Sequence, residues 1–483
     1  MTGDPVSLTF LGYILVMLGV GYMAWRRTRT MGDYLLGGRR LGRFSTALSA
    51  EASDMSGWLL MGLPGYAYVA GLESLWLAAG LLAGTWLNWR FMAPALRLAS
   101  GGECDALTIP ELLAGRHPGR GRSLRILSAL FILFFFTIYT ASGLVAGGKL
   151  FAASFGWDYR SAVLGAMTVI MLYTLFGGFL AVVWTDVIQG LMMGAALVVV
   201  PALLLQHFGG WPQLATSIAH IDADLLDPWT NRQGEALGLM AIASLLAWGL
   251  GYFGQPHILA RFMAIREARD FPAARRIAIG WVSITLGGAV LVGLGAVAYL
   301  DPPLPQGEQE KVFIHLVQQL FNPWLAGFLL AAILAAIMST ADSQLLVASS
   351  ALAEDLLQAL RGSDSSHHAR LWLGRSAVLV IAVIATLLAL DPDSQVLDLV
   401  AYAWAGFGAS FGPVLLLSLY SRLSATAALA GLLGGGATVV VWHHLQGGWF
   451  ELYEIIPGFA VSTAIMLVTN RFVPDQRNSH GRQ

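Results

Sequence analysis

The sequence is poor in the residues on which soluble enzymes and disulfide-stabilised proteins depend. Charged residues make up only 12% of the 483 residues, and cysteine occurs once, at Cys104. A single cysteine excludes an internal disulfide bond and a cysteine-based metal cluster. The formal net charge of −1 argues against a nucleic-acid partner.

Familiar catalytic motifs are missing as well. The ten histidines have no metal-ligand spacing, and the chain has no glycine-rich phosphate loop, nucleophile elbow or His-Glu-x-x-His sequence. The first apolar run begins near Ser7, without a basic segment before it or a small-residue cleavage site. We therefore expect a non-enzyme without a cofactor, and a first apolar run that is retained as a membrane span.

Apolar residues, by contrast, are abundant. They account for 56% of the chain, and the mean hydropathy is +0.66. Repeated runs of about 20 apolar residues are typical of membrane-spanning helices, so we predict an all-α membrane protein with about 13 transmembrane helices. The predicted spans cover residues 6–25, 44–72, 74–96, 124–152, 160–178, 181–206, 236–259, 275–300, 312–353, 371–390, 395–420, 423–443 and 451–471. The second, fourth and ninth are longer than a bilayer requires, which predicts tilt, a break or a turn outside the membrane.

Arginines gather in alternate loops between these spans. The loops after spans one, three, seven and nine contain Arg26, Arg27, Arg29, Arg39, Arg40, Arg43, Arg97, Arg116, Arg120, Arg122, Arg125, Arg261, Arg266, Arg269, Arg275, Arg276, Arg361, Arg370 and Arg375. An excess of arginine marks the cytoplasmic side, so we expect the N-terminus outside and the C-terminus inside. We expect no soluble domain, and a disordered polar tail after Arg471.

One predicted span contains a polar stretch. Residues 50–58 include Glu51, Asp54, two serines and a glycine, although a charge at mid-bilayer costs about 2.5–3.5 kcal/mol even on the lenient insertion scale. A helix that breaks here would free backbone carbonyls to bind a cation. The alternative interpretation is a polar kink that packs against neighbouring helices.

A second interruption follows five spans later, in the glycine-rich segment 249–256. Its glycines relax the backbone, and Pro256 lacks an amide donor. The two interrupted spans enter the membrane in opposite directions, as expected for the inverted halves of a transporter with a central binding site. Helix kinks alone are the alternative explanation.

Hydroxyl groups share one face of the ninth span, where Ala336, Ser339, Thr340 and Ser343 follow helical spacing. Two hydroxyls combined with carbonyls from a broken helix suit sodium, because neutral oxygens suffice for one charge and calcium usually recruits more carboxylates. In the alternative, both hydroxyls bond back to their own helix.

Further side chains are candidates for the same site. Asp186 and Asp342 are intramembrane acids, and Asp186 is either an ordinary helix-start carboxylate or a core-facing group that assists the ion. Trp248 and Tyr252 are i, i+4 neighbours beside the second interruption, and Tyr139 lies in span four. These aromatic residues form either a substrate wall or ordinary packing.

Seven motifs carry a resemblance to a known family. They lie at residues 53–65, 135–139, 177–182, 248–262, 338–340, 402–409 and 453–459. In this order they resemble the sodium/solute symporter family, in particular its bacterial sodium/proline branch. The resemblance covers essentially the whole chain, and the motifs are specific only in combination.

The resemblance implies a five-plus-five inverted repeat of the leucine-transporter type, with broken helices in spans two and seven. It places a first helix and loop at 1–43, the two repeats at 44–206 and 236–420, an extracellular loop at 207–235, and two peripheral helices with the tail at 421–483. It also implies one coupling sodium with Asp54 in support. The implied ligands are the carbonyls of Ala52, Met55 and Ala336 and the hydroxyls of Ser339 and Thr340.

For the transported solute, the resemblance implies L-proline. An aromatic site suits it, because a pyrrolidine ring needs apolar walls and its ammonium can lie over an aromatic face. The positions implied around proline are Ser56, Gly57, Tyr139, Trp248, Tyr252 and Pro256. Arg39 matches an arginine on the cytoplasmic side that is linked to transport.

Two positions depart from the family pattern. Glu51 stands where glycine is expected, and Asp342 stands where a small residue is expected. In some relatives a second sodium uses the positions that match Asp186, Ser339, Asp342 and Ser343. An acid at position 342 therefore favours either such a site or an altered proton sensitivity.

We expect a secondary active symporter that imports L-proline with sodium by alternating access across the bacterial cytoplasmic (inner) membrane. Its expected partners are sodium, L-proline and the lipid bilayer, without an obligate protein partner. A sodium symporter for another small amino acid or osmolyte is the alternative within the same class. A membrane sensor or a channel on the same fold is the alternative from another class.

Overall fold

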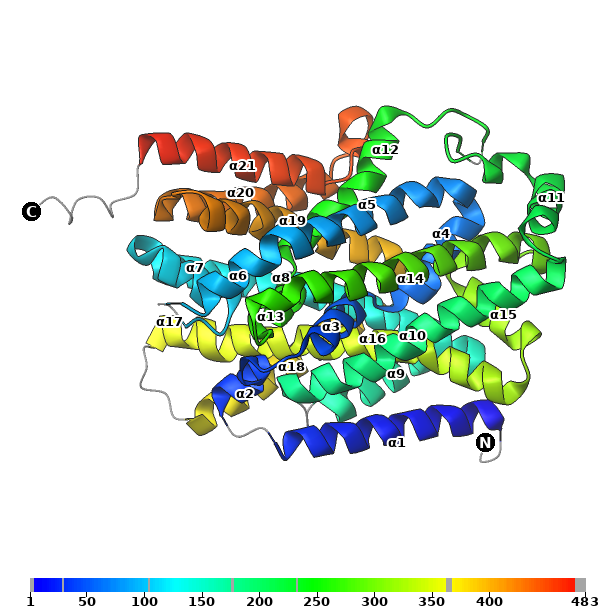
Figure 1. Cartoon of the computed structure of the whole chain (residues 1–483), viewed down its shortest axis with the longest axis horizontal. Helices are drawn as coiled ribbons and strands as arrows, with labels where there is room; N and C mark the ends of the chain where they lie inside the picture. Colours follow the sequence, from blue (N-terminus) through cyan, green and yellow to red (C-terminus); the bar gives the residue numbers. More distant parts are fainter. Residues whose placement is uncertain are drawn as a thin grey trace, which may run out of the picture.

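The computed structural model describes residues 4–27, 30–102, 105–174, 178–231, 233–361 and 367–473, and it is helical throughout. Arg29, Cys104, Gly177 and the tail from residue 474 lie outside these ranges. The long helices run roughly side by side and form a bundle (Figure 1). Their buried apolar side chains make one continuous core.

The first helices in the chain are α1 (Pro5–Trp25), α2 (Met31–Leu36), α3 (Arg43–Asp54), α4 (Leu63–Ala70), α5 (Ser74–Leu87), α6 (Ala93–Ser100), α7 (Ile109–Arg116) and α8 (Gly121–Phe155). The middle part contains α9 (Tyr159–Thr174), α10 (Phe179–Phe208), α11 (Trp211–Ile221), α12 (Leu239–Leu246), α13 (Pro256–Ala264) and α14 (Phe271–Tyr299). The last part contains α15 (Val312–Leu320), α16 (Pro323–Ser350), α17 (Leu357–Arg361), α18 (His367–Ala389), α19 (Val396–Tyr420), α20 (Ala425–His443) and α21 (Ile455–Phe472).

Nine helical stretches in the described ranges are long and apolar enough to cross a membrane. They are Pro5–Ala24, Trp58–Ser100, Pro118–Phe155, Phe179–Phe208, Ala268–Tyr299, Pro323–Leu360, Val396–Tyr420, Ala425–His443 and Ile455–Phe472. Shorter apolar helices lie at Tyr159–Leu172, Leu239–Gly254 and Leu373–Ala389. The protein is therefore a multi-pass membrane protein.

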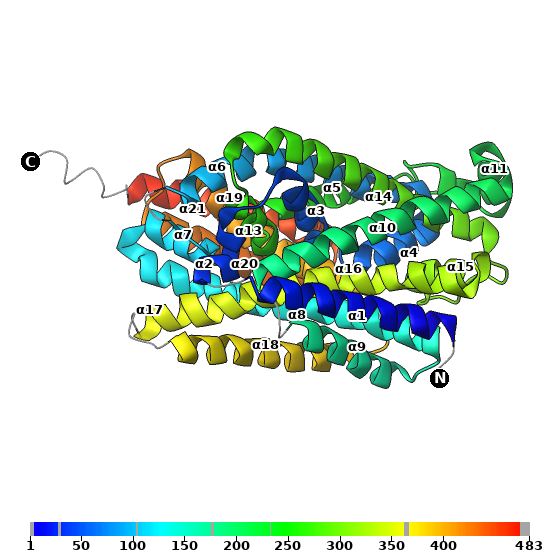
Figure 2. The same cartoon turned by 60° about the horizontal axis from the view of Figure 1, so that its bottom comes forward.

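Two segments at the centre of the bundle depart from regular α-helix. α3 ends at Asp54, Met55 has φ −84° and ψ 84°, and the helix resumes in the segment η2 (Trp58–Gly62). Between α12 and α13 the chain tightens into a 3-10 segment, η7 (Ala247–Gly254). Pro256 then begins α13, since a proline in the first turn loses no helical hydrogen bond. Figure 2 shows α3 and α13 in the interior, where most of their side chains are buried.

The ninth predicted span, 312–353, is divided into two helices, which is one of the outcomes expected from its excess length. α15 ends at Leu320, and the side chain of Asn322 accepts hydrogen bonds from the backbone amides of Trp324 and Leu325, both at 3.2 Å. This cap begins a separate helix, α16, with Pro323 in its first turn. The apolar pattern continues across the boundary, so hydropathy alone does not give its position.

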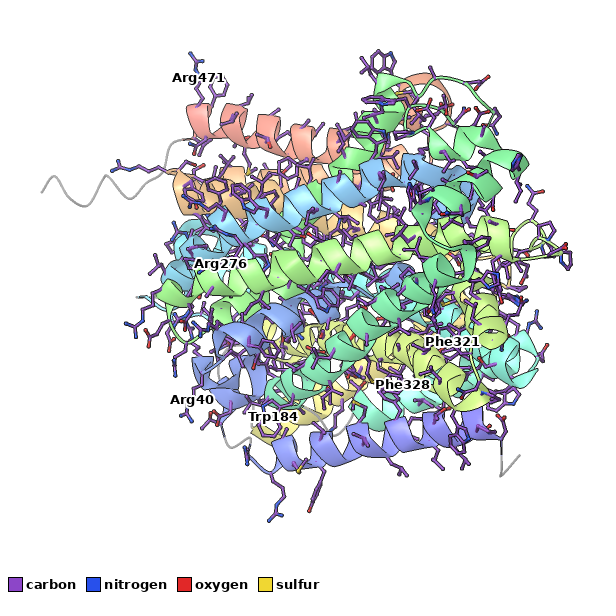
Figure 3. The ribbon with its side chains drawn as sticks, turned by 45° about the vertical axis from the view of Figure 1, so that its right-hand side comes forward. Arg40, Trp184, Arg276, Phe321, Phe328 and Arg471 are labelled. Carbon is purple, nitrogen blue, oxygen red and sulfur yellow. The ribbon has the colours of Figure 1, made fainter. Side chains whose placement is uncertain are left out.

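Three exposed arginines lie at one end of the bundle. Figure 3 shows Arg40, Arg276 and Arg471 at one end, with Phe321 toward the other. The first described helix begins at the end of the bundle opposite to the one where α21 stops (Figure 1). These positions give the bundle a basic end and a polarity along its long helices.

Glycines allow α5 and η7 to approach closely. A Cβ atom on Gly84 would lie 2.3 Å from the carbonyl oxygen of Gly249, and one on Gly249 would lie 2.3 Å from the carbonyl oxygen of Gly80. Small residues of this kind let helix backbones pack directly against one another in a membrane. The contact fixes η7 against α5.

Gly84→Ala should therefore destabilise the protein by about 1–3 kcal/mol, the usual cost of overpacking. The measurement is thermal unfolding of the purified protein in detergent. Gly280→Ala is the matched control, because Gly280 is exposed on α14 and no neighbouring atom lies within 4 Å of its added Cβ. Equal unfolding temperatures for the two variants would contradict the close contact.

Candidate functional site

Asp54, the last residue of α3, is the centre of a buried polar cluster. The Tyr252 hydroxyl from η7 donates a hydrogen bond to Asp54 Oδ2 at 2.8 Å. The Tyr139 hydroxyl from α8 and Trp58 Nε1 both donate to the backbone oxygen of Asp54, each at 3.3 Å. The end of α3, the 3-10 segment η7 and α8 therefore meet at one residue.

Gly57 allows the chain to continue past this cluster. A Cβ atom on Gly57 would lie 2.7 Å from the Ala146 side chain on α8 and 3.4 Å from that of Ile337 on α16. Ser56, just before it, is buried, and its backbone amide donates to the Asp54 carbonyl at 3.0 Å. The chain therefore passes between two helices at a point where a larger residue has no room.

Ser339 on α16 contacts the end of α3 directly. Its Oγ lies 2.7 Å from the carbonyl oxygen of Ala52 and 3.0 Å from that of Ala336. The Ser339 hydroxyl is one of the five oxygens expected around sodium, and two of the other four thus lie within hydrogen-bonding distance of it. Met55 is buried and non-helical, so its carbonyl is not held in a regular α-helix.

The neighbouring Thr340 hydroxyl is a further candidate ligand, because its oxygen can coordinate a cation. It is buried and has no hydrogen-bond partner among the described residues. A buried hydroxyl without a partner is costly, and a small cation is a ligand that would satisfy it. Neutral oxygens from α3 and α16 therefore suit a monovalent cation at this junction.

Trp248 and Tyr252 face different neighbours, although both lie in η7. The Trp248 ring stacks on Tyr453, with centroids 5.4 Å apart, whereas the Tyr252 ring packs edge-to-face on Trp404 at 5.0 Å. Trp404 Nε1 also donates to the Trp248 carbonyl at 2.7 Å. Trp248 and Tyr453 line a surface hollow, so the structure groups Tyr252 with Asp54 and places Trp248 toward that opening.

Pro256 lies beside a different hollow, which Thr108 and Asp355 also line. The next residue, His257, is fully buried, and neither of its ring nitrogens has a hydrogen-bond partner among the described residues. Its ring is 6.2 Å from that of Tyr139. No sequence pattern marks His257 as a site residue, because its burial and unpaired ring nitrogens result from contacts between distant segments.

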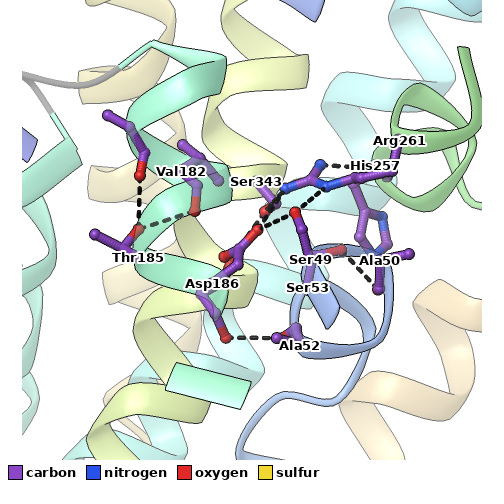
Figure 4. Close-up of polar contacts among 12 residues, drawn as sticks. Ser49, Ala50, Ala52, Ser53, Val182, Thr185, Asp186, His257, Arg261 and Ser343 are labelled. Carbon is purple, nitrogen blue, oxygen red and sulfur yellow. Dashed lines mark hydrogen bonds and ion pairs between the residues drawn. The ribbon is translucent and has the colours of Figure 1, made fainter. Parts of the chain in front are cut away.

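Asp186 on α10 and Arg261 on α13 form a completely buried ion pair (Figure 4). Arg261 Nη2 lies 3.1 Å from Asp186 Oδ2, and Ser49 Oγ from α3 donates to the same oxygen at 2.6 Å. The guanidinium also donates to Ser343 Oγ on α16. Four helices are therefore joined around one positive charge, and Asp186 faces the core.

The placement of Arg261 in a cytoplasmic loop is wrong. α13 continues to Ala264, and Arg261 is fully buried within it. Its Nη1 donates to the His257 carbonyl at 2.8 Å, and its guanidinium carbon lies 5.3 Å from the centre of the Phe179 ring. A count of arginines near predicted helix ends does not distinguish a buried arginine from an exposed one.

The two acids that depart from the family pattern contact different parts of the bundle. Asp342 Oδ1 accepts a hydrogen bond from Thr174 Oγ1 on α9 at 2.6 Å. Glu51 Oε1 accepts one from Trp89 Nε1 at 2.8 Å, and its other carboxyl oxygen has no partner among the described residues. Asp342 and Ser343 are adjacent on α16, so their side chains leave the helix in different directions.

Arg39 lies outside the central cluster, in the short helical turn after α2. Its Nη2 donates to the carbonyl oxygens of Ser100 at 2.9 Å and Ala106 at 2.8 Å, and it pairs with Asp105 at 3.0 Å. Burial lowers the pKa of Arg39, and the nearby Asp105 carboxylate opposes that change. Arg39 thus ties the segment before α3 to the segment after α6.

Comparisons with known proteins identify the family of this chain. A model of the Sodium:solute symporter family matches residues 34–435. The chain belongs to this family. The family predicted from the seven motifs is therefore confirmed, and with it the prediction of a transporter rather than an enzyme.

Relatives with known names are similar over nearly the full length. A "Sodium/proline symporter" from Salmonella typhimurium is 50% identical over 461 residues, which cover 94% of this chain and 90% of the relative. The "High-affinity proline transporter PutP" of Bacillus subtilis is 48% identical over 448 residues, or 92% and 93% of the two chains. The "Osmoregulated proline transporter OpuE" of the same organism is 48% identical over 455 residues, or 93% and 91%.

Solved structures show that the fold is shared with other cation-coupled transporters. A Na⁺-coupled sialic acid symporter aligns with a TM-score of 0.80 at 20% identity, over 97% of this chain and 98% of that one. Mhp1, a nucleobase-cation-symport-1 family transporter, aligns with a TM-score of 0.56 at 14% identity, over 92% and 97%. At these identities the likeness concerns the fold alone.

Tyr252→Phe should destabilise the protein by about 1–3 kcal/mol, because it removes the donor to buried Asp54 and leaves that carboxyl oxygen without its partner. Thermal unfolding of the purified protein in sodium-free buffer measures this loss. Tyr299→Phe, at a half-buried tyrosine at the end of α14, is the control. A Tyr252→Phe protein that unfolds at the parental temperature would show that the hydroxyl bond contributes nothing.

Proposed function

We propose that this protein is a symporter that imports L-proline together with sodium across the bacterial cytoplasmic membrane. The observation that carries the proposal is the contact between Ser339 and the carbonyl of Ala52, which places the hydroxyl face of α16 against the end of α3. This contact occurs in a chain that is 42–50% identical to sodium/proline symporters over most of its length.

Sodium would bind where α3 and α16 meet. Its ligands would be the carbonyls of Ala52, Met55 and Ala336 and the hydroxyls of Ser339 and Thr340. The ion would exchange the 2.7 Å bond from Ser339 to Ala52 for coordination by both oxygens, and it would give the Thr340 hydroxyl a partner. Asp54, which ends α3, would support the site by holding the backbone in its non-helical course.

Proline would bind next to the sodium, at the aromatic cluster. Tyr139 and Tyr252 converge on Asp54 and would form one wall. The half-helix that begins after Gly57 would present its first backbone amides to the carboxylate, as half-helix ends do in other transporters. Trp248 and Pro256 line hollows at different parts of the cluster and would contact proline as it enters or leaves.

Alternating access would use the two interrupted segments as moving parts. We propose 13 spans with a five-plus-five inverted repeat from spans two to eleven, the N-terminus outside and the C-terminus inside. The basic end of the bundle, with Arg40 and Arg276, would then lie in the cytoplasm (Figure 3). Arg39, which bonds to the segment after α6, would help to close that side.

The energy of one sodium ion is sufficient for this task. A tenfold sodium gradient provides about 1.4 kcal/mol, and a membrane potential of 100 mV provides about 2.3 kcal/mol more. Together they support an accumulation of a few hundredfold, on the order of 10² to 10³. A second sodium at Asp186, Asp342 and Ser343 stays a prediction from the family resemblance.

Uptake of radiolabelled L-proline into proteoliposomes tests the function. Uptake should require an inward sodium gradient, increase with an inside-negative potential, and be inhibited by excess unlabelled proline. Stronger inhibition by another amino acid or osmolyte would favour the symporter with a different solute. Sodium flux without any solute dependence would contradict symport and favour a channel.

Ser339→Ala should raise the sodium concentration for half-maximal uptake about tenfold or more, equivalent to about 1.4 kcal/mol of lost binding energy. The reason is the loss of one of the proposed neutral ligands. Ser283→Ala is the control, because Ser283 is exposed on α14 and its Oγ donates to the Ile279 carbonyl of its own helix. An unchanged sodium requirement in Ser339→Ala would move the ion away from α16.

A further inference from the structure

Asp355 is a buried acid outside the central cluster. It lies in the π-helical segment η10 (Ala351–Leu356), between α16 and α17, and Figure 1 shows α17 at the end of the bundle where α21 stops. Asp355 Oδ1 accepts hydrogen bonds from Thr108 Oγ1 and Arg125 Nε, both at 2.9 Å. Asp355 Oδ2 has no hydrogen-bond partner among the described residues. A buried carboxylate oxygen without a partner is costly unless a ligand binds it.

The charges around Asp355 do not cancel. The charged groups that act on it are Arg125 and Glu111. Arg125 Nη2 lies 3.6 Å from Glu111 Oε1, so this guanidinium is shared between two carboxylates. One positive charge therefore faces two negative charges, and Asp355 is the fully buried one of the two acids. A monovalent cation at Asp355 Oδ2 would balance the group.

Asp355 lines the hollow that also reaches Pro256. Most of the residues around this hollow are apolar, and Asp355 is the charged one among the described residues that line it. Thr108 and Ser350 add a hydroxyl group each. The cavity volume is about 20 Å³, whereas one water-sized particle needs about 10–15 Å³. The hollow therefore suits a small cation with oxygen ligands rather than an amino acid.

One face of α16 leads from the proposed sodium site to this hollow. This face carries Ser339, Ser343, Leu346 and Ser350, at spacings of four, three and four residues. Leu346 and Ser350 line the hollow. In η10 the backbone hydrogen bonds close over five residues rather than four, and Asp355 follows Ser350 by five. The π-helical segment therefore brings Asp355 to the same hollow as Ser350, and such segments are frequent at functional sites.

We propose that Asp355 forms a binding site for a monovalent cation, through which sodium passes as it leaves toward the cytoplasm. The ligands would be Asp355 Oδ2 and the hydroxyls of Thr108 and Ser350. The inference rests on the proposed sodium symport and adds a site between the central one and the cytoplasm. The carboxylate attracts the ion, and Arg125 on its other oxygen weakens that attraction, so the ion can leave again, as conduction through successive sites requires.

Thallium(I), a heavy monovalent cation, tests the site directly, because its anomalous scattering marks its position in a crystal. Crystals of the parental protein with thallium(I) should show a peak at Asp355 Oδ2, and sodium should displace it. Asp355→Asn should lose this peak and keep the one between α3 and α16. Glu354→Gln is the matched control, because it neutralises the adjacent acid, which is not among the residues that line the hollow. It should keep both peaks.

Ser350→Ala makes the test independent of the folding of Asp355→Asn. It keeps the pair of Arg125 and Asp355 and removes one neutral ligand, so the peak at Asp355 should become weaker. The Ser350 hydroxyl otherwise donates to the Val347 carbonyl of its own helix at 2.8 Å, a bond that contributes little to helix stability. No peak at Asp355 in the parental protein, or an undiminished peak in either variant, would overturn the inference.

Transport distinguishes a site on the sodium pathway from an ion that only balances charge. Sodium inside proteoliposomes should occupy the Asp355 site and delay the release of the next ion. Asp355→Asn should therefore raise the internal sodium concentration that half-inhibits proline uptake, by about threefold or more, without changing the external sodium requirement. Unchanged inhibition by internal sodium would overturn the passage of sodium through this site. Parental uptake that needs no external sodium would instead refute the proposed function.

Discussion

The arrangement depends on the end of α3 at Asp54 inside the bundle. A helix that stops within a membrane leaves backbone groups that lipid does not satisfy, so protein groups or a ligand must do so. Here Tyr139 and Trp58 donate to the Asp54 carbonyl, and Tyr252 donates to its carboxylate. These bonds hold α8, η7 and α3 together at Asp54. Nearby in α3, the carbonyl oxygen of Ala52 contacts Ser339 on α16.

Buried charges are paired across helices in the same way. Arg261 and Asp186 join α13 to α10, Lys149 and Glu310 form a buried pair at 2.7 Å, and Arg125 pairs with fully buried Asp355 at 2.9 Å. Each pair connects segments that are distant in sequence. Such pairs contribute little net stability compared with apolar packing, but breaking one of them is costly, so they specify which helices are neighbours.

Much of this structure could be predicted from the sequence, because apolar runs and the polar residues that interrupt them can be recognised in short stretches of the chain. The polar stretch at Asp54 and the glycines before Pro256 do mark the places where the regular helix ends. The length of the ninth span predicted tilt, a break or a turn, but the position of the boundary at Asn322 was not predicted, because a helix cap within an apolar run does not change its hydropathy. Arg261 was predicted in a loop and His257 was not predicted in the site, because burial and contacts between distant segments decide their environment.

An experimental structure with sodium and L-proline bound tests the central claim most directly. We expect an ion density between α3 and α16 that is coordinated by oxygens of Ala52, Ser339 and Thr340. The proline should lie against Tyr139 and Tyr252, and the direct hydrogen bond from Ser339 to Ala52 should be replaced by coordination. Ion density elsewhere, with Ser339 still bonded to Ala52 and proline bound, would contradict it.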